Sequence, residues 1–166
     1  AALTGHLVLS TLHTNNAIGV IPRLLDMGVD PFLLSPTLVM AIGQRLVRRL
    51  CLDSRKKIKV SGKVKEIIAK EPASMPESTQ AELKNLPPDV CQPEVSASCP
   101  KGTRGRIGVF EVLTMTPELE KIILTGPSES RIQEEARRQG MITMRQDGIL
   151  KVLKGVISLE ELFEVV

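Results

Sequence analysis

The chain has 166 residues, 42% of them hydrophobic and 25% charged, with a formal net charge of +3. This composition is typical of a globular protein and excludes a disordered or collagen-like chain. No segment of the chain is strongly basic, so none requires nucleic acid as a partner. The basic and acidic side chains number 4 and 2 in residues 1–50, 9 and 7 in residues 51–102, and 9 and 10 in residues 103–166. The chain has no Tyr or Trp to stack on single strands.

Residues 1–50 are predicted to form one strand and then helices. The apolar run at residues 6–13 is typical of a strand buried in a parallel sheet. A helix is then expected to end at Gly28, and Asp30-Pro31 predicts the start of another. Apolar side chains recur at every fourth position after that and predict one face of a further helix, namely Leu38, Ile42, Leu46 and Leu50.

Residues 51–102 are interpreted as a loop-rich insertion. They hold six of the eleven prolines, and Thr79-x-x-Glu82 predicts a capping box for one of two short helices. The chain has three cysteines, an odd number that argues against a disulfide framework. We therefore expect reduced thiols at Cys51, Cys91 and Cys99.

Residues 103–166 are predicted to form a small helical domain attached to one strand at 106–113. Turn and capping residues divide the rest into helices at about 117–126, 128–139 and 144–154, followed by a last helix capped by Ser158. The sequence as a whole therefore predicts an α/β fold.

Complete catalytic motifs are absent from the sequence. It contains no G-x-x-x-x-G-K-[ST], G-x-G-x-x-G, H-E-x-x-H, G-x-S-x-G or C-x-x-C. His6 and His13 would face opposite sides of one strand, so they cannot share a metal. His13 and Thr11 would share the carboxyl end of that strand, where parallel sheets place ligands. The alternative is a strand-end histidine bonded to a neighbouring loop.

Several blocks, in order along the chain, resemble the type II secretion and type IV pilus assembly ATPases. The first, Thr-Gly-His-Leu-Val-Leu-Ser-Thr-Leu-His-Thr-Asn-Asn-Ala, resembles the histidine box of that family. Together the blocks cover most of the chain outside the insertion: residues 4–17, 23–34, 44–51, 105–113, 140–148 and 154–161.

The resemblance implies a hexameric motor that hydrolyses Mg-ATP, peripheral on the cytoplasmic face of the inner membrane and bound to a secretion or pilus platform protein. This chain resembles its C-terminal portion: a truncated RecA-like core piece at 1–50, the insertion at 51–102 and the helical domain at 103–166. The Walker A and Walker B segments lie upstream in the family. The chain alone is therefore expected to be inactive.

The resemblance also implies roles for single residues. His6, Thr11 and His13 become candidate catalytic residues, with His13 placed to sense the γ-phosphate or its water. Arg106 and Gly108 match a tail motif that approaches the nucleotide.

Two further arginines, Arg23 and Arg45, occupy motif positions and become candidate subunit contacts. Their alternative is a surface or intrachain salt bridge.

Zinc is not expected, although the family usually carries two C-x-x-C pairs beside its insertion. Here Cys51-Leu-Asp-Ser54 and Cys99-Pro-Lys-Gly102 have each lost one cysteine. Asp53 is a possible replacement ligand, and a solvated loop carboxylate is the alternative reading.

The sequence leaves three other functions open. The chain would serve as a non-catalytic docking or oligomerisation module if the histidine strand were only scaffold. Residues 102–105 match the GXXG loop of RNA-binding KH domains, but a four-residue match is weak and no nucleic acid is expected. Charges at 55–70 would suit anionic lipid, or a solvated surface.

Overall fold

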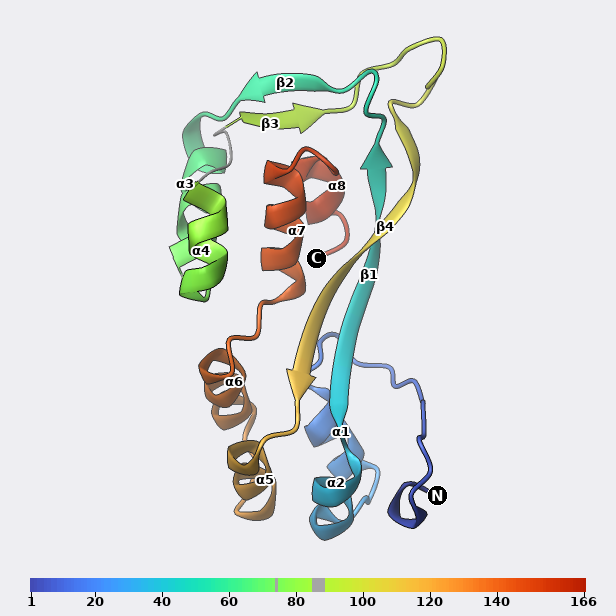
Figure 1. Ribbon diagram of the computed structural model, residues 1–166, viewed down its shortest axis with the longest axis vertical. Helices are drawn as coiled ribbons and strands as arrows, with labels where there is room; N and C mark the ends of the chain where they lie inside the picture. Colours follow the sequence, from blue (N-terminus) through green and yellow to red (C-terminus); the bar gives the residue numbers. More distant parts are fainter. Residues whose placement is uncertain (74, 85–88) are drawn as a thin grey trace. The chain divides into compact units, whose positions relative to one another are not determined.

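The structure is a computed structural model that describes residues 1–73, 75–84 and 89–166, and it is mixed α/β (Figure 1). It divides into two compact units, which we call unit 1 (residues 1–43 and 111–141) and unit 2 (residues 44–110 and 142–166). Unit 1 holds 5 basic against 8 acidic side chains, and unit 2 holds 17 against 11, so their net charges are −3 and +6. The three-part division of the chain stays a prediction.

Two long strands form an antiparallel pair, β1 (Met40–Leu50) and β4 (Thr103–Thr114), and the unit boundary falls within each (Figure 1). β4 confirms the strand predicted at 106–113, but the helix predicted through Leu38–Leu50 is wrong. A spacing of four is an even number, so it marks one face of a strand as well as one face of a helix. In β1 the predicted core side chains Ile42 and Leu46 are exposed, whereas Ala41 and Val47 are buried.

Unit 1 contains a short 3-10 helix and four α-helices around one core. The helices are Ala2–Thr4, α1 (Val20–Asp26), α2 (Pro31–Thr37), α5 (Pro117–Leu124) and α6 (Glu129–Arg138). Asp30 accepts a hydrogen bond from the Phe32 N–H and caps α2, as its position before Pro31 predicts. The core is aliphatic and includes Ile21, Leu34, Leu113, Leu119, Ile123 and Ile132.

The strand predicted at residues 6–13 is wrong. This segment has no regular secondary structure, and Leu7 and Leu9 are 84% and 89% exposed. A buried strand is stabilised by neighbouring strands, which pair its backbone and cover its side chains. Across residues 1–73, 75–84 and 89–166 no strand pairs with this segment.

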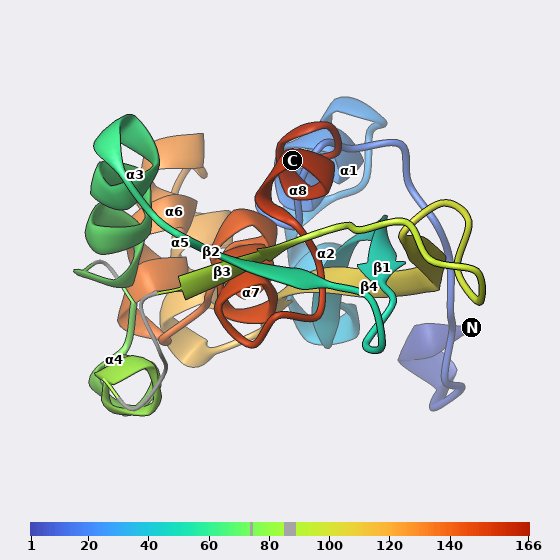
Figure 2. The same cartoon turned by 90° about the horizontal axis from the view of Figure 1, so that it is seen from above.

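Unit 2 packs two C-terminal helices and a small two-stranded sheet around its own core. The helix α7 (Met144–Leu153) begins where one was predicted and is capped by Thr143, and α8 (Leu159–Phe163) begins after its predicted cap, Ser158. Strands β2 (Lys56–Lys59) and β3 (Asp89–Gln92) pair in antiparallel register and cross over α7 (Figure 2). The core includes Val47, Val109, Ile149, Val152, Ile157 and Leu162.

The insertion contains the two expected helices, α3 (Gly62–Ala73) and α4 (Glu77–Lys84). The capping box predicted at Thr79 is wrong, because α4 already begins at Glu77 and Thr79 lies inside it. No helix among the described residues is long and apolar enough to cross a lipid bilayer.

Candidate functional site

The histidine segment, residues 6–13, lies on the surface of unit 1. His6, Thr11 and His13 are all exposed. The Nδ1 atom of His6 lies 3.0 Å from the hydroxyl of Thr4, within hydrogen-bond distance. No second part of the described chain encloses His13, so the structure presents it to solvent and not in a built catalytic pocket.

A buried carboxylate, that of Glu111, binds the turn that follows His13. The Glu111 side chain is 4% exposed, and its Oε1 atom accepts a hydrogen bond of 2.6 Å from the Ala17 N–H. Asn16 closes the same turn by accepting from the Gly19 N–H at 2.8 Å. A Cβ on Gly43 would lie 2.7 Å from the Glu111 Cγ, so only glycine leaves room for this side chain.

Glu111 was not predicted as a functional or structural residue, although the sequence carries a signal for it. Val109, Glu111 and Leu113 share one face of β4 by period-two alternation, and all three are buried. A carboxylate on an apolar strand face must find hydrogen-bond donors, so its position predicts a buried contact.

In unit 2, Arg106 is exposed and Gly108 is half-buried on β4. Gly108 leaves room for the aromatic ring of Phe110, because a Cβ at position 108 would lie 2.5 Å from atoms of that ring. The Phe110 N–H donates to Asp147 Oδ2 at 2.8 Å, and Asp147 also pairs with the Lys151 ammonium group. The space beside Gly108 is therefore filled by Phe110.

The two candidate interface arginines have different surroundings. Arg23 is exposed on α1, whereas Arg45 is half-buried in β1 and donates to the carbonyl oxygen of Gln44 at 3.3 Å. Neither forms an ion pair with any residue that the structure describes. The alternative of an intrachain salt bridge is not found for either, and their role at a subunit interface stays a prediction.

The predicted site residues are divided between the two units. His6, Thr11, His13 and Arg23 belong to unit 1, whereas Arg45, Arg106 and Gly108 belong to unit 2. None of them lines the pocket beside Cys51 or the one beside Ser158. Within its own unit, each histidine is exposed, and the space beside Gly108 is filled by Phe110.

A half-buried ion pair within α6, Glu135 with Arg138, is linked to the start of α5 in unit 1. Glu135 accepts from Arg138 Nε at 2.6 Å and from the Thr116 hydroxyl at 2.9 Å. The hydrogen bond from Arg138 is the main cause that lowers the pKa of Glu135 to about 2, and Gln139 and Thr116 add to it against the effect of burial. Glu135 in turn raises the pKa of Arg138. This network is structural, because it lies within the helix pair.

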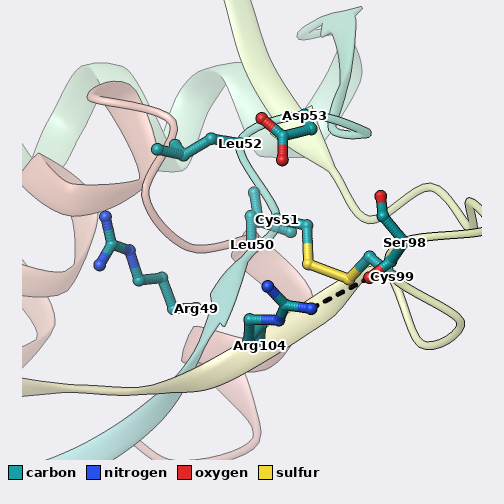
Figure 3. Close-up of a pocket in the computed structure, with 8 residues that line it drawn as sticks. All are labelled: Arg49, Leu50, Cys51, Leu52, Asp53, Ser98, Cys99 and Arg104. Carbon is teal, nitrogen blue, oxygen red and sulfur yellow. Dashed lines mark hydrogen bonds between the residues drawn. A yellow bond between two sulfur atoms is a disulfide. The ribbon is translucent and has the colours of Figure 1, made fainter.

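Two cysteines from opposite ends of the insertion form a disulfide, Cys51–Cys99, with their Cα atoms 6.6 Å apart (Figure 3). The expectation of reduced thiols is therefore wrong for this pair, whereas Cys91 is a free, buried thiol. The two cysteines are 48 residues apart in sequence, so their proximity depends on tertiary structure. Because β3 runs antiparallel to β2, the chain that leaves β3 returns toward residue 51, where the insertion begins. There the Cys51 N–H donates to the Gly102 carbonyl oxygen at 3.1 Å.

Residues 1–164 match the family model described as Type II/IV secretion system protein. The chain belongs to this family. It is 41% identical over 170 residues to the type II secretion system protein E of Xanthomonas campestris, covering 99% of this chain and 28% of that protein. It is 39% identical over 161 residues to the type IV pilus assembly ATPase PilB of Pseudomonas aeruginosa, covering 97% and 27%.

A further relative, the type II secretion system protein E of Aeromonas hydrophila, is 42% identical over 168 residues, which covers 99% of this chain and 30% of that protein. The resemblance to secretion and pilus ATPases is therefore confirmed. The chain spans less than a third of the length of the curated relatives it matches.

In this member of the Type II/IV secretion family, the cysteines that could bind zinc are changed by the disulfide. Both cysteines that remain from the two pairs are joined to each other, and Asp53 lines a pocket beside them. Among the described residues, no group of three or more His, Cys, Asp or Glu side chains is close enough to hold a metal ion.

Proposed function

We propose that this chain is the C-terminal portion of a hexameric ATPase that powers type II protein secretion or type IV pilus assembly. The ATPase would couple ATP hydrolysis to subunit motion in a homo-hexamer, peripheral on the cytoplasmic face of the inner membrane and bound to a platform protein. The observation that carries this proposal is the family match over residues 1–164, at 36% to 42% identity to relatives named for these two machines.

In this proposal residues 1–50 complete a RecA-like core, and the helical domain at 103–166 follows the insertion. ATP and Mg²⁺ would be held by the Walker A and Walker B segments of the longer protein, because the sequence of this chain contains no G-x-x-x-x-G-K-[ST] loop. His13 would sense the γ-phosphate, with His6 and Thr11 beside it. Arg106 and Gly108 would approach the nucleotide, and Arg23 and Arg45 would contact neighbouring subunits.

The test uses the longer protein that contains this chain and the same protein with His13→Ala. We expect hydrolysis by the hexamer to fall at least tenfold in the variant, and Asn15→Ala, an exposed neighbour, to leave it unchanged. The isolated chain should show no ATP turnover. Turnover by the isolated chain would contradict the proposal.

One observation favours a second function, a non-catalytic docking or oligomerisation module. The histidine segment is exposed and unpaired with any strand of the described chain, which suits a surface covered by another protein or by another part of the same one. Unchanged hydrolysis in His13→Ala with loss of the hexamer, measured by native mass spectrometry, would favour docking. Lost hydrolysis with an intact hexamer would favour the motor.

A further inference from the structure

The Cys51–Cys99 disulfide lines a pocket of about 210 Å³ in unit 2, a feature that the proposed ATPase function does not use. Five of the eight lining residues are exposed, so solvent reaches the pocket. The lining set is Arg49, Leu50, Cys51, Leu52, Asp53, Ser98, Cys99 and Arg104 (Figure 3). Small solutes can therefore enter beside the disulfide, although its two cysteines are themselves only 8% and 5% exposed.

The pocket carries more positive than negative charge. Arg49 and Arg104 contribute two guanidinium groups, and Asp53 contributes the single carboxylate of the lining. Neither arginine is paired with a carboxylate in the part of the chain that the structure describes. An anionic solute is therefore attracted to this pocket over a cationic one.

Arg104 is held next to one of the two sulfur-bearing residues. Its Nη2 atom donates to the carbonyl oxygen of Ser98 at 3.1 Å, and Ser98 directly precedes Cys99 (Figure 3). This hydrogen bond fixes a positive charge at the backbone of Cys99. A thiolate that forms at Cys99 would be stabilised by that charge.

We propose that this pocket is a thiol–disulfide exchange site for anionic small thiols, a class represented by glutathione. The thiolate attacks Cys51 Sγ, a new sulfur–sulfur bond forms there, and the Cys51–Cys99 bond breaks. Cys99 leaves with the bonding electron pair as a thiolate beside Arg104. A second thiolate then attacks the small-molecule sulfur of the mixed disulfide, which releases Cys51 and leaves one oxidised dimer of the small thiol.

The choice of Cys51 as the attacked residue follows from the position of Arg104. Cys99 is the residue whose departure the charge of Arg104 favours, and exchange is faster when the leaving thiolate is stabilised. The exchange opens the covalent link between the two ends of the insertion.

The experiment treats the oxidised 166-residue chain with glutathione and follows the intact mass, with peptide mapping of the adduct. We expect a glutathione adduct on Cys51, formed more slowly as NaCl rises because salt screens the attraction. Arg104→Gln should slow the exchange by about three- to tenfold for glutathione and by less for cysteamine, a cationic thiol, because both reactions lose the stabilised leaving thiolate and only glutathione also loses the attraction to Arg104. Lys59→Gln removes the same charge from an exposed position outside the pocket, and should not alter either rate.

Several results would overturn the proposal. The first is no adduct at all, and the second is an adduct confined to Cys91 or to Cys99. The third is equal slowing of glutathione and cysteamine exchange in Arg104→Gln, or equal slowing of glutathione exchange in Arg104→Gln and Lys59→Gln. If Arg104→Gln fails to fold, the salt series on the unmodified chain decides. Glutathione exchange must then slow with NaCl while exchange with neutral 2-mercaptoethanol stays constant, and any other outcome contradicts the proposed site.

Discussion

Glu111 on β4 binds the backbone N–H of Ala17 at 2.6 Å, although the two residues are 94 positions apart. Both residues are buried, and Ala17 follows the histidine segment by four positions. A carboxylate in the C-terminal part of the chain therefore fixes the turn next to His13. Two predictions depend on this contact.

Replacing Glu111 with Ala should lower the free energy of unfolding by about 2–3 kcal/mol, because it leaves a buried N–H without its acceptor. Glu111→Gln keeps an amide oxygen in the same place and should cost less. Urea unfolding measures both. Val112→Ala, at the exposed neighbouring position, is the control and should change little. Equal losses in Glu111→Ala and Val112→Ala would show that the hydrogen bond is unimportant.

Gly43→Ala should also destabilise the chain, because its Cβ would lie 2.7 Å from the Glu111 Cγ and 2.8 Å from its Oε1. The clash disappears when Glu111 is itself shortened. In a double-mutant cycle with Glu111→Ala, the two losses should therefore be less than additive. Gly108→Ala is the comparison, since it meets the partly exposed ring of Phe110, which has room to rotate. Strict additivity of the first pair would contradict the contact.

Acid should weaken unit 1 through Glu135. The pKa of this carboxyl is lowered from its ordinary 4.5 to about 2, so its contribution is fully present above pH 4.5 and is lost as the pH falls toward 2. After allowance for solvent screening we expect a loss of about 1–2 kcal/mol. Unfolding by urea between pH 5 and 2 measures it. Glu135→Gln should flatten the profile, whereas Glu120→Gln, at an exposed position on α5, should keep it.

The isolated chain should self-associate through its histidine segment. Leu7 and Leu9 are 84% and 89% exposed, and unpaired backbone beside apolar side chains favours association. Analytical ultracentrifugation over a concentration series should show oligomers that the Leu7→Ser, Leu9→Ser double variant loses. Val95→Ser, which changes a residue 71% exposed elsewhere, should keep them. A concentration-independent monomer would refute the prediction.

The predictable part of the fold is the part encoded locally. Helices α5 to α8 begin at Thr116, Ser128, Thr143 and Ser158, and each of these side chains caps the helix that follows it. Such caps use residues within three positions, so the sequence shows them directly.

The parts that escaped prediction depend on residues far apart in the chain. The apolar pattern of residues 6–13 predicts a strand, but a strand needs neighbours, which the described chain does not supply. The Cys51–Cys99 contact and the Glu111–Ala17 contact span 48 and 94 positions. The charge difference between the units was also hidden, because each unit combines two separate stretches of sequence.

The disulfide also determines what a single backbone cut in the insertion would do. Because Cys51 and Cys99 lie on either side of α3 and α4, a protease that cleaves once within those helices severs the polypeptide without releasing a fragment. The nicked molecule gains only the mass of one water and stays in one piece until a reductant divides it in two.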